Sequence, residues 1–247
     1  FAICASFTIL AGFSILIYMF LNGTPALFKV GIKDILFGTV WKPTAAEPQY
    51  GIFYVILTSI VGTAMAILIG VPIGLLTAVF LAEAAPQKVA AVVKPAVELL
   101  AGIPSIVYGF FGLMVMVPLV RRLLGGSGKS ILTAALLLGV MILPSIISVA
   151  ENALRAVPGS YYEGALALGA THERAVFTVV LPAARSGILA GIVLGLGRAV
   201  GEATAVAMVA GNQTAMPYSL LRGVRTLTTN IIMEMGYAEG LLRQALF

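Results

Sequence analysis

Charged residues are scarce in this chain of 247 residues, at 10% of its positions, whereas a soluble domain carries about 25%. Hydrophobic residues make up 60% of the chain, and the mean hydropathy is +1.05. This composition excludes an ordinary soluble globule, and it excludes a disordered chain, which would be polar and highly charged. We therefore expect the chain to be divided into membrane spans of about 20 residues each.

Cysteine, histidine and aspartate are nearly missing, because Cys4, His172 and Asp34 are the only residues of their types. A lone cysteine cannot form an internal disulfide, and a lone histidine leaves too few ligands for a zinc site. Fifteen basic residues against ten acidic ones give a net charge of +5. The basic residues stand singly or in pairs between apolar runs, whereas a nucleic-acid-binding protein gathers them on one face. We expect neither a metal centre nor a nucleic-acid partner.

Apolar runs long enough to cross a bilayer core of about 30 Å recur along the chain. Five runs occupy residues 1–21, 51–82, 99–120, 131–150 and 186–211, and the start of a sixth occupies residues 236–247. A signal peptide is the alternative for the first run, but that run is longer than the usual apolar core and no clean cleavage site follows it. The runs predict an all-α, polytopic helix bundle of about six spans.

Prolines interrupt three of these runs, at positions 72, 104, 118 and 144, and predict kinked helices. The bundle is expected to form a single transmembrane domain over residues 1–247. The chain begins at Phe1 and stops at Phe247 inside an apolar run. We interpret it as a fragment that is truncated at both ends, with its last span incomplete.

One long polar stretch separates the fourth and fifth runs, at residues 151–187. Ser160 and Glu163 have the spacing of a capping box at the start of a helix. Gly169 suits the position just after a helix end, so these signals predict a short helix of about two turns. A second helix is expected to begin near Thr171 and to stop before Pro182.

The short helix also carries its own apolar side chains, namely Tyr161, Tyr162, Leu166 and Leu168. Apolar residues on a long structured loop are typical of a docking surface for another protein. The alternative is a helix that lies on lipid, but such helices are usually rich in lysine and arginine. This helix has neither between Ser160 and Gly169, so we favour docking.

This stretch resembles the EAA loop of ABC importer permeases, whose pattern is Glu-Ala-Ala, three residues, Gly, nine residues, Ile, one residue and Leu-Pro. The matching positions are, in order, Glu163, Gly164, Ala165, Gly169, Val179, Leu181 and Pro182. Gly164 replaces the usual Ala and Val179 the usual Ile. The resemblance implies the fold of a type I ABC importer permease, with a cytoplasmic coupling loop at about 151–185 whose helix seats in a groove of an ATPase subunit.

Three other stretches resemble the permeases of phosphate-specific transport systems, and in particular their PstC-type subunits. These stretches are residues 98–118, 195–212 and 226–240. The resemblance implies a multi-pass subunit of a bacterial-type cytoplasmic membrane. It also implies a homologous PstA-type permease, ATPase subunits that bind ATP and Mg, and an extracytoplasmic phosphate-binding protein as partners. This resemblance begins at about residue 50, and we assign no role to the loop at 22–50.

Two alternatives to a phosphate importer remain at this point. The first is a permease of the same superfamily for another oxyanion, such as molybdate or sulfate. The second is a stand-alone channel or secondary transporter, which has no use for a coupling loop.

Two charged residues lie inside the fifth run, Arg198 and Glu202. A charge near the bilayer centre is costly, and such residues are functional by default. If the run is one helix, both lie on a stripe of small residues with Gly187, Gly191 and Gly195, and Ile192, Leu196 and Val200 face lipid.

We interpret Arg198 and Glu202, with Gly195 and Gly201, as candidate residues of a substrate pathway, because an arginine fork suits an oxyanion. The alternative is that Arg198 and Glu202 only neutralise each other inside a packed interface.

Residues 125–130, GGSGKS, resemble the end of a phosphate-binding Walker A loop. The full pattern requires glycine at position 123, which is Leu123, and a preceding strand. The single aspartate, Asp34, also leaves no Walker B residue to hold Mg²⁺. We interpret this stretch as a turn, and we expect ATP and Mg to be bound by a partner rather than by this chain.

The charge distribution opposes the orientation that the EAA resemblance implies. With that loop inside, the inner side holds five basic residues, Lys88, Lys94, Arg155, Arg174 and Arg185. The outer side then holds eight, Lys29, Lys33, Lys42, Arg121, Arg122, Lys129, Arg222 and Arg225. This is the reverse of the positive-inside rule, and charge alone therefore leaves the orientation open.

Overall fold

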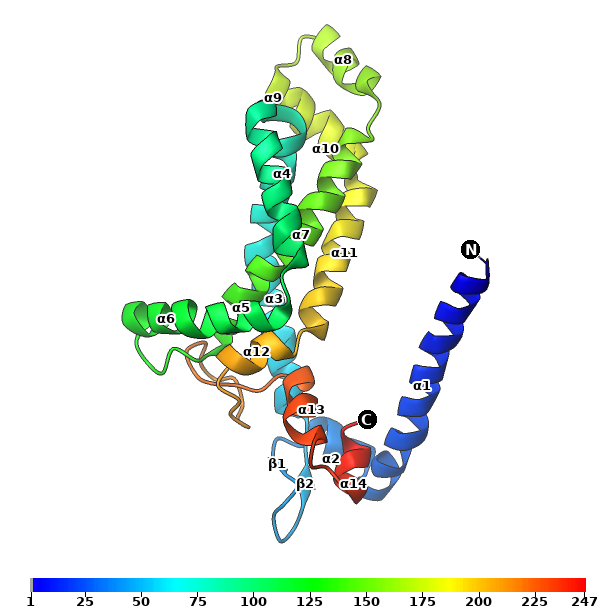
Figure 1. The fold of residues 1–247 in the computed structure, drawn as a ribbon, viewed down its shortest axis with the longest axis vertical. Coiled ribbons are helices and arrows are strands. Elements are labelled where there is room, and N and C mark those ends of the chain that lie inside the picture. Colours follow the sequence, from blue (N-terminus) through cyan, green and yellow to red (C-terminus); the bar gives the residue numbers. More distant parts are fainter. Residues whose placement is uncertain (1) are drawn as a thin grey trace.

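The computed structural model describes residues 2–247, and these residues are mostly helical (Figure 1). The first half of the chain contains α1 (Ala2–Val30), α2 (Ile32–Phe37), β1 (Trp41–Lys42), β2 (Gln49–Tyr50), α3 (Phe53–Val79), the π-helical turn η1 (Phe80–Ala84), α4 (Gln87–Gly102), α5 (Ser105–Phe111), the π-helical turn η2 (Gly112–Met116) and α6 (Val117–Leu124). The second half contains α7 (Ile131–Arg155), α8 (Gly159–Ala167), α9 (His172–Ala175), the π-helical turn η3 (Val176–Val180), α10 (Leu181–Ala183), α11 (Arg185–Gly201), α12 (Thr204–Val209), α13 (Leu227–Met235) and α14 (Gly240–Ala245).

Four helical segments are long and apolar enough to cross a membrane: Ile3–Val30, Phe53–Ala84, Ser105–Leu124 and Ile131–Arg155. A fifth candidate is the pair His172–Ala183 and Arg185–Gly201, which is bent by 70°. These helices confirm the all-α, polytopic fold. Residues 236–247 contain only the short α14, so the sixth span is not among the helices of the described residues.

The third apolar run is not one helix. It divides at Ile103 and Pro104, which have extended backbone between α4 and α5. Proline disfavours helical backbone at the residue before it, which explains the break. Helix α4 packs against α7, whereas the rod formed by α5, η2 and α6 lies across the long helices (Figure 1). The predicted span at 99–120 is therefore wrong in its boundaries.

Helix α7 forms the centre of the bundle, with α3 and α11 packed against it. Glycines permit this close packing. A Cβ atom at Gly74 of α3 would lie 2.9 Å from Ile146 of α7, and one at Gly191 of α11 would lie 3.2 Å from Val149. Small residues at helix contacts let backbones approach each other within a membrane. The glycine stripe predicted for the fifth run is thus confirmed as a packing surface for α7.

Helix α1 lies apart from these long helices in Figure 1, and its C-terminal end lies beside α2 and α14. The loop at 22–50 contains the end of α1, α2 and the two-stranded hairpin, in which Trp41 pairs with Tyr50. Their rings meet edge to face, 5.9 Å apart. These aromatic residues belong to a separate core cluster, with Tyr54 of α3 and Ala238. The loop is therefore a packed cap at the end of the molecule remote from α8.

Candidate functional site

Helix α8 projects from the end of the bundle, and none of its residues is buried. The predicted capping box at its start is wrong. Pro158 is the cap residue, and neither Ser160 nor Glu163 makes the capping bonds. Pro158 has extended backbone, with φ −58° and ψ 131°, and the helix begins at Gly159, which places Ser160 inside the first turn. Glu163 and Gly164 are exposed on the helix and Ala165 is half-buried.

The end of α8 matches the prediction. Gly169 has φ +87°, its N–H donates to the Leu166 carbonyl at 2.9 Å, and the Ala170 N–H donates to the Ala165 carbonyl at 3.1 Å. These two bonds form a Schellman motif, in which glycine adopts the left-handed conformation. Beside it, Leu168 is 92% exposed. The turn therefore fixes the direction in which the chain leaves α8 and presents an apolar side chain outward.

The second predicted helix begins as expected, since the Thr171 hydroxyl accepts a bond from the Arg174 N–H. Its predicted end before Pro182 is wrong, because helical structure continues to Ala183. Pro182 lies in the first turn of α10, just after η3, where a proline is tolerated because its missing N–H is not required. Leu181 packs against a buried cluster and Pro182 is exposed. Both lie close to the 70° bend.

A hydrogen bond fastens α8 to this second helix. The Tyr162 hydroxyl lies 2.7 Å from Nδ1 of His172, and the two rings meet nearly edge to face. Tyr162 also packs against the cluster that contains Val176, Val180 and Ile188. The structure thus brings Glu163, Gly164, Ala165 and Gly169 together on one projecting element that is anchored to the bundle through Tyr162.

The fifth run does not form one continuous helix through Glu202. Helix α11 ends at Gly201, and Glu202 has extended backbone with ψ 121°. The Glu202 carboxylate accepts a hydrogen bond of 2.9 Å from the Ala205 N–H. This bond offers the chain an alternative to continued helix, after a glycine-rich stretch with low helix propensity.

Consequently the structure does not support the alternative in which Arg198 and Glu202 neutralise each other as an ion pair. Among residues 2–247, the ion pairs of the structure involve other residues. Arg198 is half-buried in the last turn of α11 and lies within electrostatic reach of Tyr108 on α5. A cation in the last turn of a helix is favoured by the helix dipole.

The two candidate glycines have different environments. A Cβ at Gly195 would lie 3.1 Å from Ile146, so Gly195 serves packing against α7. Gly201 faces open space. Of the side chains expected to face lipid, Ile192 instead packs against a buried cluster, whereas Val200 is exposed. The structure therefore separates a packing face of α11 from the turn that carries Arg198.

A small cavity of about 20 Å³ lies beside Glu202. Hydroxyl groups of Ser59, Thr63, Thr226 and Thr228 belong to residues that line it. The Thr228 hydroxyl donates to the Glu202 carbonyl at 3.0 Å. The cavity has room for one water molecule. These hydroxyls were not predicted from the sequence, although the run TLTT at residues 226–229 carries several of them.

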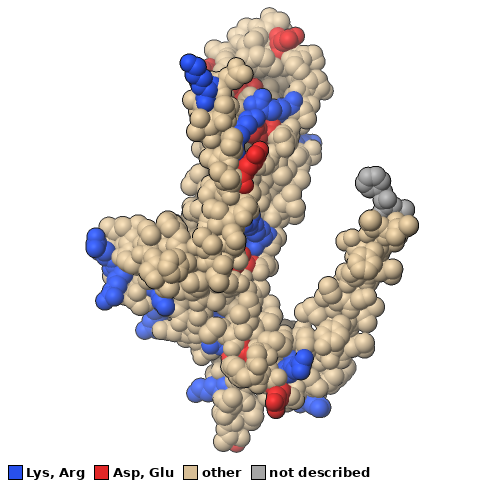
Figure 2. Space-filling model, viewed as in Figure 1, with Lys and Arg blue, Asp and Glu red and all other residues tan. Residues whose placement is uncertain are grey.

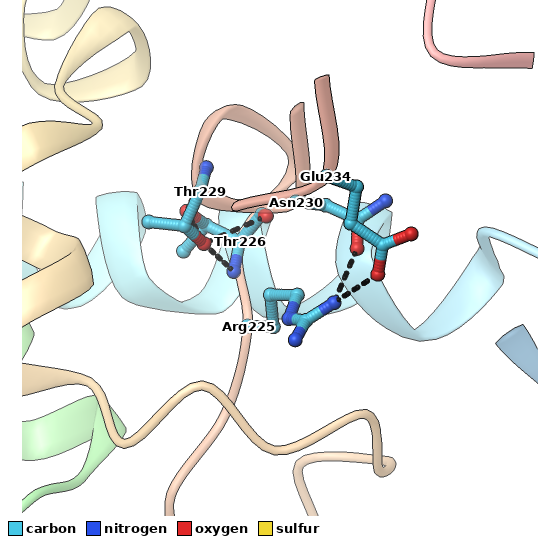
Figure 3. Close-up of polar contacts among 5 residues, drawn as sticks. All are labelled: Arg225, Thr226, Thr229, Asn230 and Glu234. Atoms are coloured by element: carbon cyan, nitrogen blue, oxygen red, sulfur yellow. Dashed lines mark hydrogen bonds and ion pairs between the residues drawn. The ribbon is translucent and has the colours of Figure 1, made fainter. Parts of the chain in front are cut away.

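A second feature that was not predicted from the sequence lies at the start of α13. Arg225 donates through one nitrogen to Glu234 at 2.7 Å and to Asn230 at 3.1 Å (Figure 3). Thr226 and Thr229 form the reciprocal capping box of the same helix. The Glu234 side chain is 7% exposed and that of Arg225 is 13% exposed. This pair ties the loop before α13 to its last turn, close to α3.

A third cluster ties three helices together at the α8 end of the bundle. The buried carboxylate of Glu151 on α7 contacts the ammonium of Lys94 on α4, and it accepts a bond of 2.8 Å from Nε of Arg155. Arg155 also donates to the Leu81 carbonyl in η1 at 2.6 Å. One carboxylate therefore connects α4, α7 and the end of α3.

We expect Glu151→Ala to lower the free energy of unfolding of the subunit by about 1–3 kcal/mol. The loss stays below the full cost of breaking a buried ion pair, because the Lys94 and Arg155 side chains are 37% and 45% exposed and can regain water. Denaturation of the purified subunit in detergent measures the change. The control is Glu98→Ala at an exposed position of α4, with an expected change within about 0.5 kcal/mol. Equal losses in the two variants would contradict the clamp.

Comparison with known proteins agrees with this architecture. The family model described as "Binding-protein-dependent transport system inner membrane component" matches residues 70–242. That range includes the central helices, α8 and the turn that carries Arg198. The chain is therefore a permease component of a binding-protein-dependent, ATP-binding-cassette transporter. Proteins of this class are multi-pass proteins of the inner membrane.

Individual relatives define the branch. A probable ABC transporter permease, YqgH of Bacillus subtilis, is 40% identical over 95% of this chain and 77% of its own length. The phosphate transport system permease PstC of Xylella fastidiosa (strain Temecula1) is 36% identical, over 98% of this chain and 80% of its own length. PstC of Haemophilus influenzae is 35% identical over 94% of this chain and 79% of its own length. The chain belongs to the PstC family of these permeases.

Proposed function

We propose that this chain carries inorganic phosphate across the cytoplasmic membrane as one permease subunit of an ATP-driven importer. The observation that carries the proposal is the identity with PstC permeases, which extends over nearly the whole chain. Those relatives are named for phosphate, and a permease for molybdate or sulfate is not favoured. A stand-alone channel is not favoured either, because it has no use for the anchored, unburied helix α8.

The partners follow from this assignment. A homologous PstA-type permease completes the membrane unit, two ATPase subunits bind ATP and Mg on the inner side, and an extracytoplasmic phosphate-binding protein supplies the substrate. Helix α8 suits the ATPase contact, because its exposed Tyr161 and Leu166, with Leu168 just after it, offer apolar surface on a projecting element.

The route from α8 to the pathway is continuous. The Tyr162–His172 bond joins α8 to the helix that ends at Ala183. Val176 and Val180 before the 70° bend and Ile188 after it share one buried cluster. A displacement of α8 therefore reaches α11, whose last turn holds Arg198. A half-buried guanidinium beside a glycine-rich turn suits transient contact with an oxyanion, which requires release as well as capture.

Uptake into vesicles tests this function. We expect the assembled complex, with its binding protein outside and ATP inside, to accumulate radiolabelled phosphate, and we expect equimolar molybdate or sulfate to leave uptake unchanged. Deletion of residues 159–169 should abolish uptake, because it removes the proposed ATPase contact. The intact complex without ATP is the control. Phosphate flux that persists without ATP and without residues 159–169 would contradict an ATP-driven permease and favour a channel.

A further inference from the structure

Four basic side chains gather where α6 ends. They are Arg121, Arg122, Lys129 and Arg222, and we call them the basic patch; all four are exposed. Figure 2 shows basic side chains at this end of the molecule, at the left, without acidic ones beside them. Residues 99–150 and 203–233, which carry the patch, contain no acidic residue. Within residues 2–247, the recorded ion pairs leave all four of them out. These charges therefore repel one another without internal compensation.

The patch stands on a rigid support. The Ser130 N–H donates to the Val209 carbonyl at 3.1 Å, and the Ile131 N–H donates to the Arg222 carbonyl at 3.3 Å. The buried Thr133 hydroxyl donates to the Gly128 carbonyl at 2.6 Å. These bonds hold the 125–130 turn against the loop that precedes α13, so Lys129 and Arg222 are displayed together beside the end of α6. Such a preorganised display reduces the entropy lost on binding.

The position of the patch relative to the apolar rod indicates its level in the membrane. Residues 99–120 carry no charge, and Arg121 and Arg122 are the first charged residues after them. Leu119, Leu123 and Leu124 on the same helix are more than half exposed, at 52%, 70% and 53%. Basic side chains that follow an apolar segment lie at the headgroup level while neighbouring leucines contact acyl chains.

We propose that the basic patch binds the phosphate groups of anionic phospholipid headgroups on the membrane face opposite α8. Arginine forks bind phosphate oxygens in pairs, and clustered basic residues are attracted to anionic lipid. Free phosphate offers the same chemistry. The lipid is favoured because the patch lies on a projecting turn beside exposed leucines, which a free ion cannot use. Lipid binding also accounts for four of the eight basic residues on the side where the positive-inside rule expects few.

Lipid retention tests the proposal on the assembled complex. Complexes are placed in membranes that contain phosphatidylethanolamine and phosphatidylglycerol, and the phosphatidylglycerol that stays bound is counted by native mass spectrometry. We expect the variant with Arg121→Gln, Arg122→Gln, Lys129→Gln and Arg222→Gln to retain at least about twofold less phosphatidylglycerol than wild type. The matched control neutralises four exposed basic residues elsewhere, with Lys29→Gln, Lys33→Gln, Lys42→Gln and Arg243→Gln. It should retain the wild-type amount.

A second arm separates the lipid from the free ion. In membranes of phosphatidylcholine alone, binding of radiolabelled phosphate to wild type and to the patch variant should be equal. If the patch variant loses phosphate binding there and keeps its phosphatidylglycerol, the patch takes the free ion and the lipid assignment is overturned. Equal retention of phosphatidylglycerol by patch and control variants also overturns it. If the fourfold variant does not assemble, Arg121→Gln with Arg122→Gln gives the same readout.

Discussion

Replacing Arg198 by glutamine is expected to lower phosphate uptake by about tenfold or more, while the subunit still inserts and assembles. The reason is that the change removes the cation available to an anion at the end of α11. A hydrogen bond to a charged group contributes about 1.5–3 kcal/mol, which corresponds to about 10–150-fold. Because Arg198 is not paired with Glu202 in this structure, the substitution leaves no buried acid unpaired. Uptake in vesicles, normalised to assembled complex, measures the effect.

Two further single variants of this subunit serve as controls for this test. Arg185→Gln removes an exposed arginine from the opposite end of α11, and its uptake should match wild type. Glu202→Gln keeps an oxygen that can accept the Ala205 N–H, so assembly should be retained. Near-normal uptake by Arg198→Gln would show that Arg198 is not part of the substrate pathway. Its role would then be that of a cation favoured by the dipole at the end of α11.

The spans at residues 1–21, 51–82 and 131–150 and the end of α8 could be predicted because their signals are local. Long apolar runs and prolines depend on a few adjacent residues, and the left-handed backbone of Gly169 depends on one residue without a Cβ. The start of α8 was mispredicted because the helix begins at Gly159, so that the cap position falls on Pro158 and not on Ser160.

The geometry of the candidate site could not be predicted, because it depends on contacts between segments that are distant in the sequence. The end of α11 is set by the Glu202 bond to Ala205 and by Thr228, a residue of another helix. A helical wheel presumes continuous helix and therefore placed Arg198 and Glu202 on one face. The Lys94–Glu151 ion pair joins two helices, and no residue spacing in the sequence predicts it.

Substituting Gly169 by valine is expected to uncouple ATP hydrolysis from transport. Gly169 has φ +87°, and a Cβ there would meet nothing within 4 Å, so the cost comes from the backbone rather than from a clash. A left-handed residue with a Cβ costs about 1–2 kcal/mol, and a β-branched one is a clear outlier. Losing the Schellman turn would change the direction of α8 relative to Thr171. Uptake should fall about fivefold or more for this strain, while ATPase activity of the complex continues.

Three observations separate this uncoupling from simple loss of the ATPase contact. Copurification of the ATPase subunits with the Gly169→Val permease should match wild type, because Tyr161, Leu166 and Leu168 remain on α8. Gly169→Asn should keep most of the uptake, since asparagine tolerates the left-handed conformation. Gly164→Ala lies in the helical part of α8, where an added Cβ meets nothing, and should leave uptake unchanged. If Gly169→Val binds the ATPase and transports phosphate at the wild-type rate, the backbone of this turn has no part in coupling.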